Sequence, residues 1–188
     1  MRTAGQAREA AVAHLAMSEV PAVLVDSNTE EFDAGWVFYY QSAHYMVTKH
    51  PGDMLVGNAP IFVARNGASP DFISYHRPTL ESVEAFVCCG NANAAPNPEV
   101  EFLGWKEGAL KVSATQAIRE CSSLGLAAAK EAVDACLSGT LARVQTKSVA
   151  AARELVSKLA SLCFIARVTY GKTVVRNGRV MHVGFREN

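Results

Sequence analysis

The sequence predicts an α+β fold arranged as two small domains, and three observations carry this expectation. The chain has 188 residues, which is long for one small domain and sufficient for two. Strand-like and helix-like apolar patterns occur on both sides of a Gly-, Asn- and Pro-rich stretch at residues 90–98. The two halves show no repeat of each other. We therefore expect an antiparallel sheet with flanking helices over residues 1–89, a linker over 90–98, and a second domain over 99–188.

The N-terminal half begins with helix-forming residues at 4–17 and a short apolar strand at 21–26. Its strongest strand pattern is GWVFYYQS at residues 35–42. In a strand, side chains alternate between the two faces. One face would carry Trp36, Phe38 and Tyr40, and the other would carry Val37 and Tyr39. Both faces are apolar or aromatic, so this strand is expected in the middle of a sheet.

The rest of the first half predicts a hairpin and a helix. Strands at 57–65 and 71–78 would pair across the turn Asn66-Gly67, and Thr79 would cap a helix. The apolar stripe of this helix is expected at Leu80, Val83, Phe86 and Val87.

The C-terminal half predicts the order β-α-α-β-α-β followed by a hairpin. Ser113 and Gln116 form a capping-box pattern, which places the start of the first helix at about residue 114. The hairpin would turn at Asn177-Gly178, a pair that tolerates the positive φ angles of a type I′ turn. The expected elements are a strand at 100–105, helices at 114–121 and 124–138, a strand at 141–147, a helix from about 148, a strand at 164–168 and the hairpin at 173–183.

Composition excludes several classes of function. Hydrophobic residues make up 49% and charged residues 19% of the chain, as in ordinary globular proteins. Eighteen basic and eighteen acidic side chains give a net charge near zero, so neither a nucleic-acid nor a membrane partner is expected. The N-terminal segment carries Arg8 and Glu9 where a secretion signal needs an apolar core. We expect a cytoplasmic protein of unknown oligomeric state.

No pattern predicts catalysis, a cofactor or a metal site. Five cysteines, an odd number without paired or metal-ligand spacing, fit a reducing compartment, and Cys88-Cys89 are expected to be buried. His44, His50 and His76 match no common ligand spacing and have no convergent carboxylate nearby in the sequence. The chain also lacks a Ser-His-Asp pattern and a dinucleotide fingerprint. We therefore expect a binding protein and not an enzyme.

The stretch KVSATQAIRECSSLGLAAAKEAVD at residues 111–134 resembles the C-terminal domain of the bacterial ribosomal stalk protein. The matching residues are Lys111, Val112, Arg119, Leu124, Gly125, Leu126 and Lys130, and the element order matches over about residues 99–168. The resemblance implies a partner-binding surface at Lys111, Val112, Arg119, Gly125, Leu126 and Lys130, where that family recruits translation factors. Gly125 would also let the two helices approach and turn. Thr115, Gln116, Ala127 and Ser123 depart from the family pattern and remove part of its positive charge.

The first half, over about residues 8–88, resembles the immunity protein 35 family of bacterial proteins that neutralise polymorphic toxins. The residues that carry this are the aromatic strand GWVFYYQSAHY at 35–45, Asp53 and Leu55, and GNAPIFV at 57–63. The resemblance implies a small α+β domain that binds a cognate protein toxin.

These observations leave more than one function open. The first hypothesis is an immunity protein that neutralises its toxin by stoichiometric binding. The second is a translation-associated adaptor that binds an elongation factor through the stalk-like helix pair. A combination of the two, and a chaperone-like binder of unfolded protein, are further alternatives.

Overall fold

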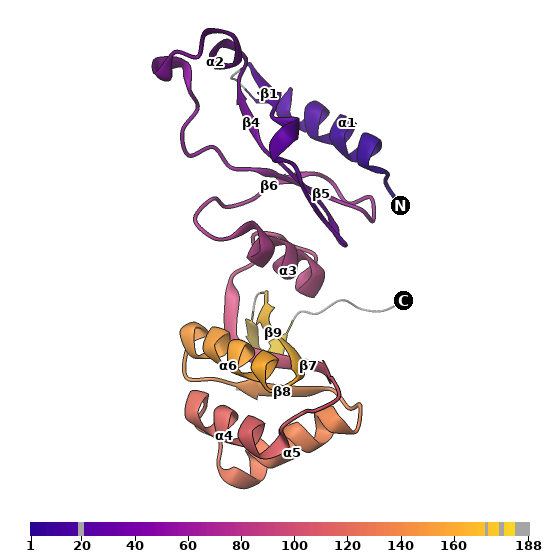
Figure 1. Ribbon diagram of the computed structural model, residues 1–188, viewed down its shortest axis with the longest axis vertical. Helices are drawn as coiled ribbons and strands as arrows, with labels where there is room; N and C mark the ends of the chain where they lie inside the picture. Colours follow the sequence, from indigo (N-terminus) through magenta and orange to yellow (C-terminus); the bar gives the residue numbers. More distant parts are fainter. Residues whose placement is uncertain (19–20, 172, 177–178, 183–188) are drawn as a thin grey trace. The chain divides into compact units, whose positions relative to one another are not determined.

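The computed structural model describes residues 1–18, 21–171, 173–176 and 179–182 (Figure 1). By its internal contacts the chain divides into two compact units, Met1–Ala94 and Ala95–Asn188. Each unit combines small antiparallel sheets with helices, so the predicted α+β class is confirmed. The domain limits 1–89 and 99–188 stay a prediction.

The first unit contains a four-stranded antiparallel sheet in the order β2-β3-β5-β6 and a separate two-stranded ladder of β1 and β4. Its elements are α1 (Ala4–Leu15), β1 (Ala22–Leu24), η1 (Asp26–Asn28), β2 (Glu30–Phe32), β3 (Gly35–Phe38), β4 (Tyr40–Ser42), α2 (Ala43–Thr48), η2 (Pro51–Asp53), β5 (Ile61–Ala64), β6 (Asp71–Phe72) and α3 (Thr79–Cys89). The hairpin of β5 and β6 across Asn66-Gly67 is confirmed: Ile61 pairs with Phe72, and Gly67 has a φ of +96°.

The strand expected over residues 35–42 is divided between two sheets. β3 ends at Phe38, and the Tyr39 carbonyl oxygen accepts a hydrogen bond of 2.8 Å from the Val25 amide. From Tyr40 onward the chain pairs with β1 as β4. The strand therefore breaks where its pairing partner changes. The apolar pattern of the sequence continues through this point and does not mark it.

Both faces of β3 are buried, as predicted. One face packs Trp36 and Phe38, with Tyr40 at its border, against Ala7 and Ala11 of α1. The other face packs Val37, with Tyr39 at its border, in a cluster that includes Val83 and Phe86 of α3. The sheet of this unit is therefore covered by a helix on each side, and β3 lies between β2 and β5.

Close approach of β3 to β5 depends on a glycine. A Cβ added at Gly35 would lie 2.3 Å from the carbonyl oxygen of Val63, which is backbone and cannot move aside. Gly35 pairs with Ala64 at this point of the ladder. Any larger residue at position 35 would separate the two central strands.

The start and the buried face of α3 differ from the prediction. Pro78 is the N-cap, and the Thr79 hydroxyl instead donates to Glu30 Oε2 at 2.9 Å. The Tyr39 hydroxyl donates to the other oxygen of Glu30 at 2.6 Å. Leu80 and Val87 are exposed, because the helix buries Ser82, Val83 and Ala85. Burial and the hydrogen bond to Glu30 raise the pKa of Tyr39 to about 12, so this phenol remains a donor at neutral pH.

The stretch expected to be a linker at 90–98 is bonded into the fold. Asn93 Nδ2 donates to the Phe72 carbonyl oxygen at 2.8 Å, and Arg77 donates to the carbonyl oxygens of Ala92 and Ala94. Residues 96–98 already belong to a strand, and Asn97 in that strand is buried. Asn and Pro here serve as turn and strand-end residues.

The second unit has a three-stranded antiparallel sheet in the order β8-β7-β9 and a C-terminal hairpin. Its elements are β7 (Pro96–Trp105), α4 (Lys111–Cys121), α5 (Leu126–Leu137), β8 (Ala142–Gln145), α6 (Val149–Ser161), β9 (Phe164–Tyr170), β10 (Thr173–Arg176) and β11 (Arg179–His182). The order β-α-α-β-α-β and the pairing of β10 with β11 were predicted. The expected turn residues Asn177 and Gly178 lie outside the described residues.

Helices α5 and α6 contact the sheet, and α4 packs on α5 and α6 (Figure 1). The predicted capping box at Ser113 and Gln116 does not form. Instead, α4 begins at Lys111 after Leu110 and has no side-chain cap. Ser148 does cap α6 and accepts a hydrogen bond from the Ala151 amide at 3.1 Å. α5 begins at Leu126, two residues later than expected.

A buried carboxylate connects all three strands of this sheet. Glu101 on β7 is 4% exposed and pairs in register with Arg143 on β8 and Arg167 on β9. Arg143 donates to Glu101 Oε1 at 2.7 Å, and Arg167 donates to Oε2 at 2.6 Å. Burial alone would raise the pKa of Glu101, but the two guanidinium groups outweigh it and hold that pKa below its usual value. The pairing therefore stabilises the fold while Glu101 is charged.

We predict that Glu101→Gln lowers the free energy of unfolding at pH 7 by about 2 kcal/mol, because two partly buried arginines lose their shared counter-charge. A carboxylate with a lowered pKa stabilises the folded state in full above about pH 4.5, and this stabilisation is lost as the pH falls through the lowered pKa. The difference between variant and wild type should therefore shrink in acid. Urea unfolding between pH 3 and pH 7 measures it.

Glu131→Gln is the matched control, since Glu131 is an exposed residue of the same unit. A Glu101→Gln variant as stable as this control at pH 7 would contradict the stabilising role of the arginine pairs.

Candidate functional site

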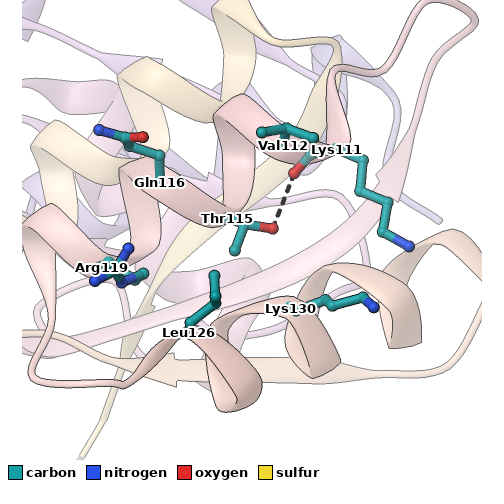
Figure 2. Close-up of a pocket in the computed structure, with 7 residues that line it drawn as sticks. All are labelled: Lys111, Val112, Thr115, Gln116, Arg119, Leu126 and Lys130. Carbon is teal, nitrogen blue, oxygen red and sulfur yellow. Dashed lines mark hydrogen bonds between the residues drawn. The ribbon is translucent and has the colours of Figure 1, made fainter.

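An open groove lies on the outer surface of the second unit, between α4 and α5. Its volume is about 210 Å³. It is lined by Lys111, Val112, Thr115, Gln116, Arg119, Leu126 and Lys130 (Figure 2). Two helices with small buried residues form it: Ala114 and Ala117 on α4, and Ala129 on α5, have no more than 5% exposure. Small side chains at this contact allow the two helices to pack closely.

The floor of the groove is apolar. Val112 is 81% exposed and Leu126 is 60% exposed, although both are large aliphatic residues. Thr115 lies between them (Figure 2), and its hydroxyl donates to the Lys111 carbonyl oxygen at 2.9 Å. Because this bond satisfies the hydroxyl within the helix, Thr115 needs no further polar partner.

Positively charged side chains lie on both sides of this floor, and they differ in whether they have an ion-pair partner. Arg119 lies on one side and Lys111 and Lys130 on the other (Figure 2). Lys111 Nζ is paired with Asp134 on α5. Within the described part of the chain, the side chains of Arg119 and Lys130 have no hydrogen-bond or ion-pair partner. The groove therefore presents two free positive charges around an apolar floor.

Glu120, which follows Arg119 on α4, already has partners of its own. Gln116 Nε2 donates to Glu120 Oε1 at 3.4 Å, and Lys158 of α6 pairs with Glu120 Oε2 at 2.8 Å. The hydrogen bonds from Lys158 and Gln116 hold the pKa of Glu120 below its usual value. Glu120 thus stays charged and bonded to Lys158, which leaves Arg119 without an acidic neighbour.

This arrangement suits contact with a protein. The groove is smaller than the pockets of roughly 300–1,000 Å³ that hold drug-sized ligands. It has room for an apolar side chain of a partner, and acidic groups beside that side chain would meet Arg119 and Lys130. Its lining offers apolar contact area and positive charge.

The structure brings five of the six predicted partner-binding residues to this groove: Lys111, Val112, Arg119, Leu126 and Lys130. Gly125 is the exception, because it is the N-cap of α5 and does not line the groove. Its φ of −72° is open to any residue and a Cβ there would meet nothing within 4 Å, so the role expected for it in helix approach is wrong.

Two lining residues were absent from the predicted set. Thr115 and Gln116 are one helical turn after Lys111 and Val112, and residues four apart lie on one face of a helix. That spacing is a signal in the sequence that could have identified them.

Other groups considered from the sequence do not form a site. Among the described residues no three His, Cys, Asp or Glu side chains are grouped as metal ligands. Cys88 and Cys89 are half-buried and not fully buried as expected, whereas burial raises the pKa of the Cys121 and Cys136 thiols. In the described part of the chain, no helix has the length and apolarity needed to cross a membrane.

The comparisons with known proteins concern the first unit. The model of the family described as immunity protein 35 matches residues 5–85, which is less than half of the chain. The predicted resemblance of the N-terminal half is therefore confirmed. No curated protein and no solved structure matches the chain. The resemblance of residues 99–168 to the ribosomal stalk protein has no support from these comparisons.

We predict that Val112→Asp and Leu126→Asp each change the free energy of unfolding by less than about 0.5 kcal/mol, because their side chains are mostly in solvent already. Ile118→Ala on the same helix should cost about 2–5 kcal/mol, since Ile118 is fully buried. Urea denaturation of the three variants tests this. A large loss of stability in Val112→Asp would mean that the groove is part of the core.

Proposed function

We propose that this protein is an immunity protein that binds a cognate bacterial toxin in a stoichiometric complex and neutralises it by covering the active site or the substrate surface. The observation that carries the proposal is the match of residues 5–85 to the immunity protein 35 family. Neutralisation of this kind requires no turnover. It requires a rigid complementary surface that buries about 1,200–2,000 Å² and contains a few strong anchors.

The architecture of the first unit supports this function. Its sheet is fixed on both faces by α1 and α3, so its loops leave from a rigid framework. A framework that does not reorganise lowers the entropy cost of association, and tight complexes depend on a low cost. An inhibitor that must outcompete a toxin's substrate benefits from such rigidity.

We predict that co-expression with its cognate toxin, to be sought among the products of the neighbouring genes, restores growth of cells that the toxin alone kills. The two purified proteins should elute together in size-exclusion chromatography with light scattering, at a fixed stoichiometry. Gly35→Val is an informative control, because the clash with the Val63 carbonyl should disrupt the first unit and abolish protection. Equal killing with and without the unaltered protein would refute the proposal.

The α4–α5 groove supports a second candidate function. Its free cations Arg119 and Lys130 and its exposed floor at Val112 and Leu126 form a small protein-binding surface outside the residues that match the immunity family. A translation elongation factor is the partner that the sequence resemblance implies. In this alternative the protein is a translation-associated adaptor.

We predict that Arg119→Glu and Lys130→Glu each weaken binding of a purified elongation factor by about 10- to 100-fold if these cations make desolvated contacts, a loss of about 1–3 kcal/mol. Lys106→Glu, an equal charge change at an exposed residue of the same unit, should leave binding unchanged. Surface plasmon resonance measures both. Equal binding by all variants and wild type, or no binding by wild type, would dispose of the adaptor function.

A further inference from the structure

The segment between β4 and β5, residues 43–58, contains α2 and η2 and is called the 43–58 loop below. Its polar groups bond to one another. The Thr48 hydroxyl donates to Asp53 Oδ2 at 2.8 Å, and His44 Nε2 lies 3.4 Å from the same oxygen. His50 Nδ1 accepts a hydrogen bond from the Gly52 amide at 3.2 Å. The loop therefore has an ordered internal network and is not an extended connection.

Both ends of the loop are attached to β4. Gln41 Nε2 donates to the Leu55 carbonyl oxygen at 3.1 Å, and Gln41 Oε1 accepts from the Leu55 amide at 2.6 Å. Asn58 Nδ2 donates to the Tyr40 carbonyl oxygen at 2.8 Å. At the other end, Ser42 accepts a hydrogen bond from the Tyr45 amide and caps α2. These bonds hold the loop in one shape relative to β4.

Four apolar side chains of the loop are exposed. Val47 is 84% exposed and Val56 is 80% exposed, and Met46 and Met54 are exposed as well. The Thr48–Asp53 hydrogen bond brings the segment with Val47 next to the segment with Met54. Exposed apolar residues on an ordered segment are characteristic of protein interaction sites.

The charges at the loop favour an acidic partner. Asp53, the acidic residue of the loop, is already bonded to Thr48 and lies beside His44. Lys49 is exposed and sits over the Tyr45 ring, with Nζ 5.5 Å from the ring centroid. It is the C-cap residue of α2, with a φ of 55°. Tyr75, an exposed ring next to Gly57, adds an aromatic group at the base of the loop.

We propose that the 43–58 loop is the toxin-binding surface of this protein, with Val47 and Val56 inserted into an apolar depression of the toxin and Lys49 facing an acidic group at its rim. This rests on the proposed immunity function. The loop lies within residues 5–85, the part that matches the immunity family, whereas the α4–α5 groove lies outside it. We therefore assign binding of the toxin to the 43–58 loop.

The test uses the full-length protein and, as probe, the toxin domain that the co-expression experiment identifies, inactivated by substitution of its active site. The double variant Val47→Asp, Val56→Asp should bind at least about 30-fold more weakly, as expected for central anchors of an interface. Lys49→Glu should slow association, most clearly at low salt. Val87→Asp, at an exposed valine of α3 in the same unit, is the matched control and should bind as wild type. Circular dichroism checks that the variants remain folded.

The outcomes separate the two proposals. If wild type binds the toxin and the double variant binds equally well, the loop assignment is wrong while the immunity function stands. Loss of toxin binding in Arg119→Glu instead would transfer the site to the groove. If wild type self-associates and only the double variant is monomeric, the loop contacts a second copy and the assignment is also wrong. If wild type neither binds nor protects, both proposals fail.

Discussion

The first unit is organised by two adjacent strands that are apolar on both faces. Trp36 and Phe38 of β3 face one side and Val37 faces the other, and β5 repeats this pattern with Ile61 and Phe62. Such strands fold only if both faces are covered, because each exposed aromatic or branched side chain would forfeit about 1.5–3 kcal/mol of burial. Helices α1 and α3 provide the two covers. Once they are in place, no sheet face remains for the apolar residues of the 43–58 loop.

The second unit differs from the first, because its sheet has one apolar face and one polar face. Alternation along β7 places Phe102 towards Cys136 of α5 and Glu101 on the other face. On the polar face, two arginines hold the charge of Glu101 and join the strands. On the apolar face, α4 packs on the other two helices. The outer side of α4 and α5 is therefore free to form a groove.

Both candidate surfaces share one physical property: a threonine hydroxyl close to the exposed apolar side chains is hydrogen-bonded within the protein. In the groove, Thr115 bonds to its own helix beneath exposed Val112 and Leu126. In the loop, Thr48, which follows the exposed Val47, bonds to Asp53. Satisfied polar groups cost nothing further when water is removed on binding, so such surfaces gain from burying their apolar groups.

The sequence by itself determined the α+β class, the alternating faces of β3 and the element order of the second half, because periodicity and turn residues act locally. It also identified most residues of the groove, through a family pattern and not through geometry. Only the tertiary structure decided that the strand at 35–42 divides at Tyr39 and that the stretch at 90–98 is bonded to the fold. It also decided that Leu80 and Val87 of α3 remain in solvent. Each of these depends on partners distant in the sequence, namely Val25, Arg77 and the sheet beneath α3, and local propensity contains no information about which distant group will be the partner.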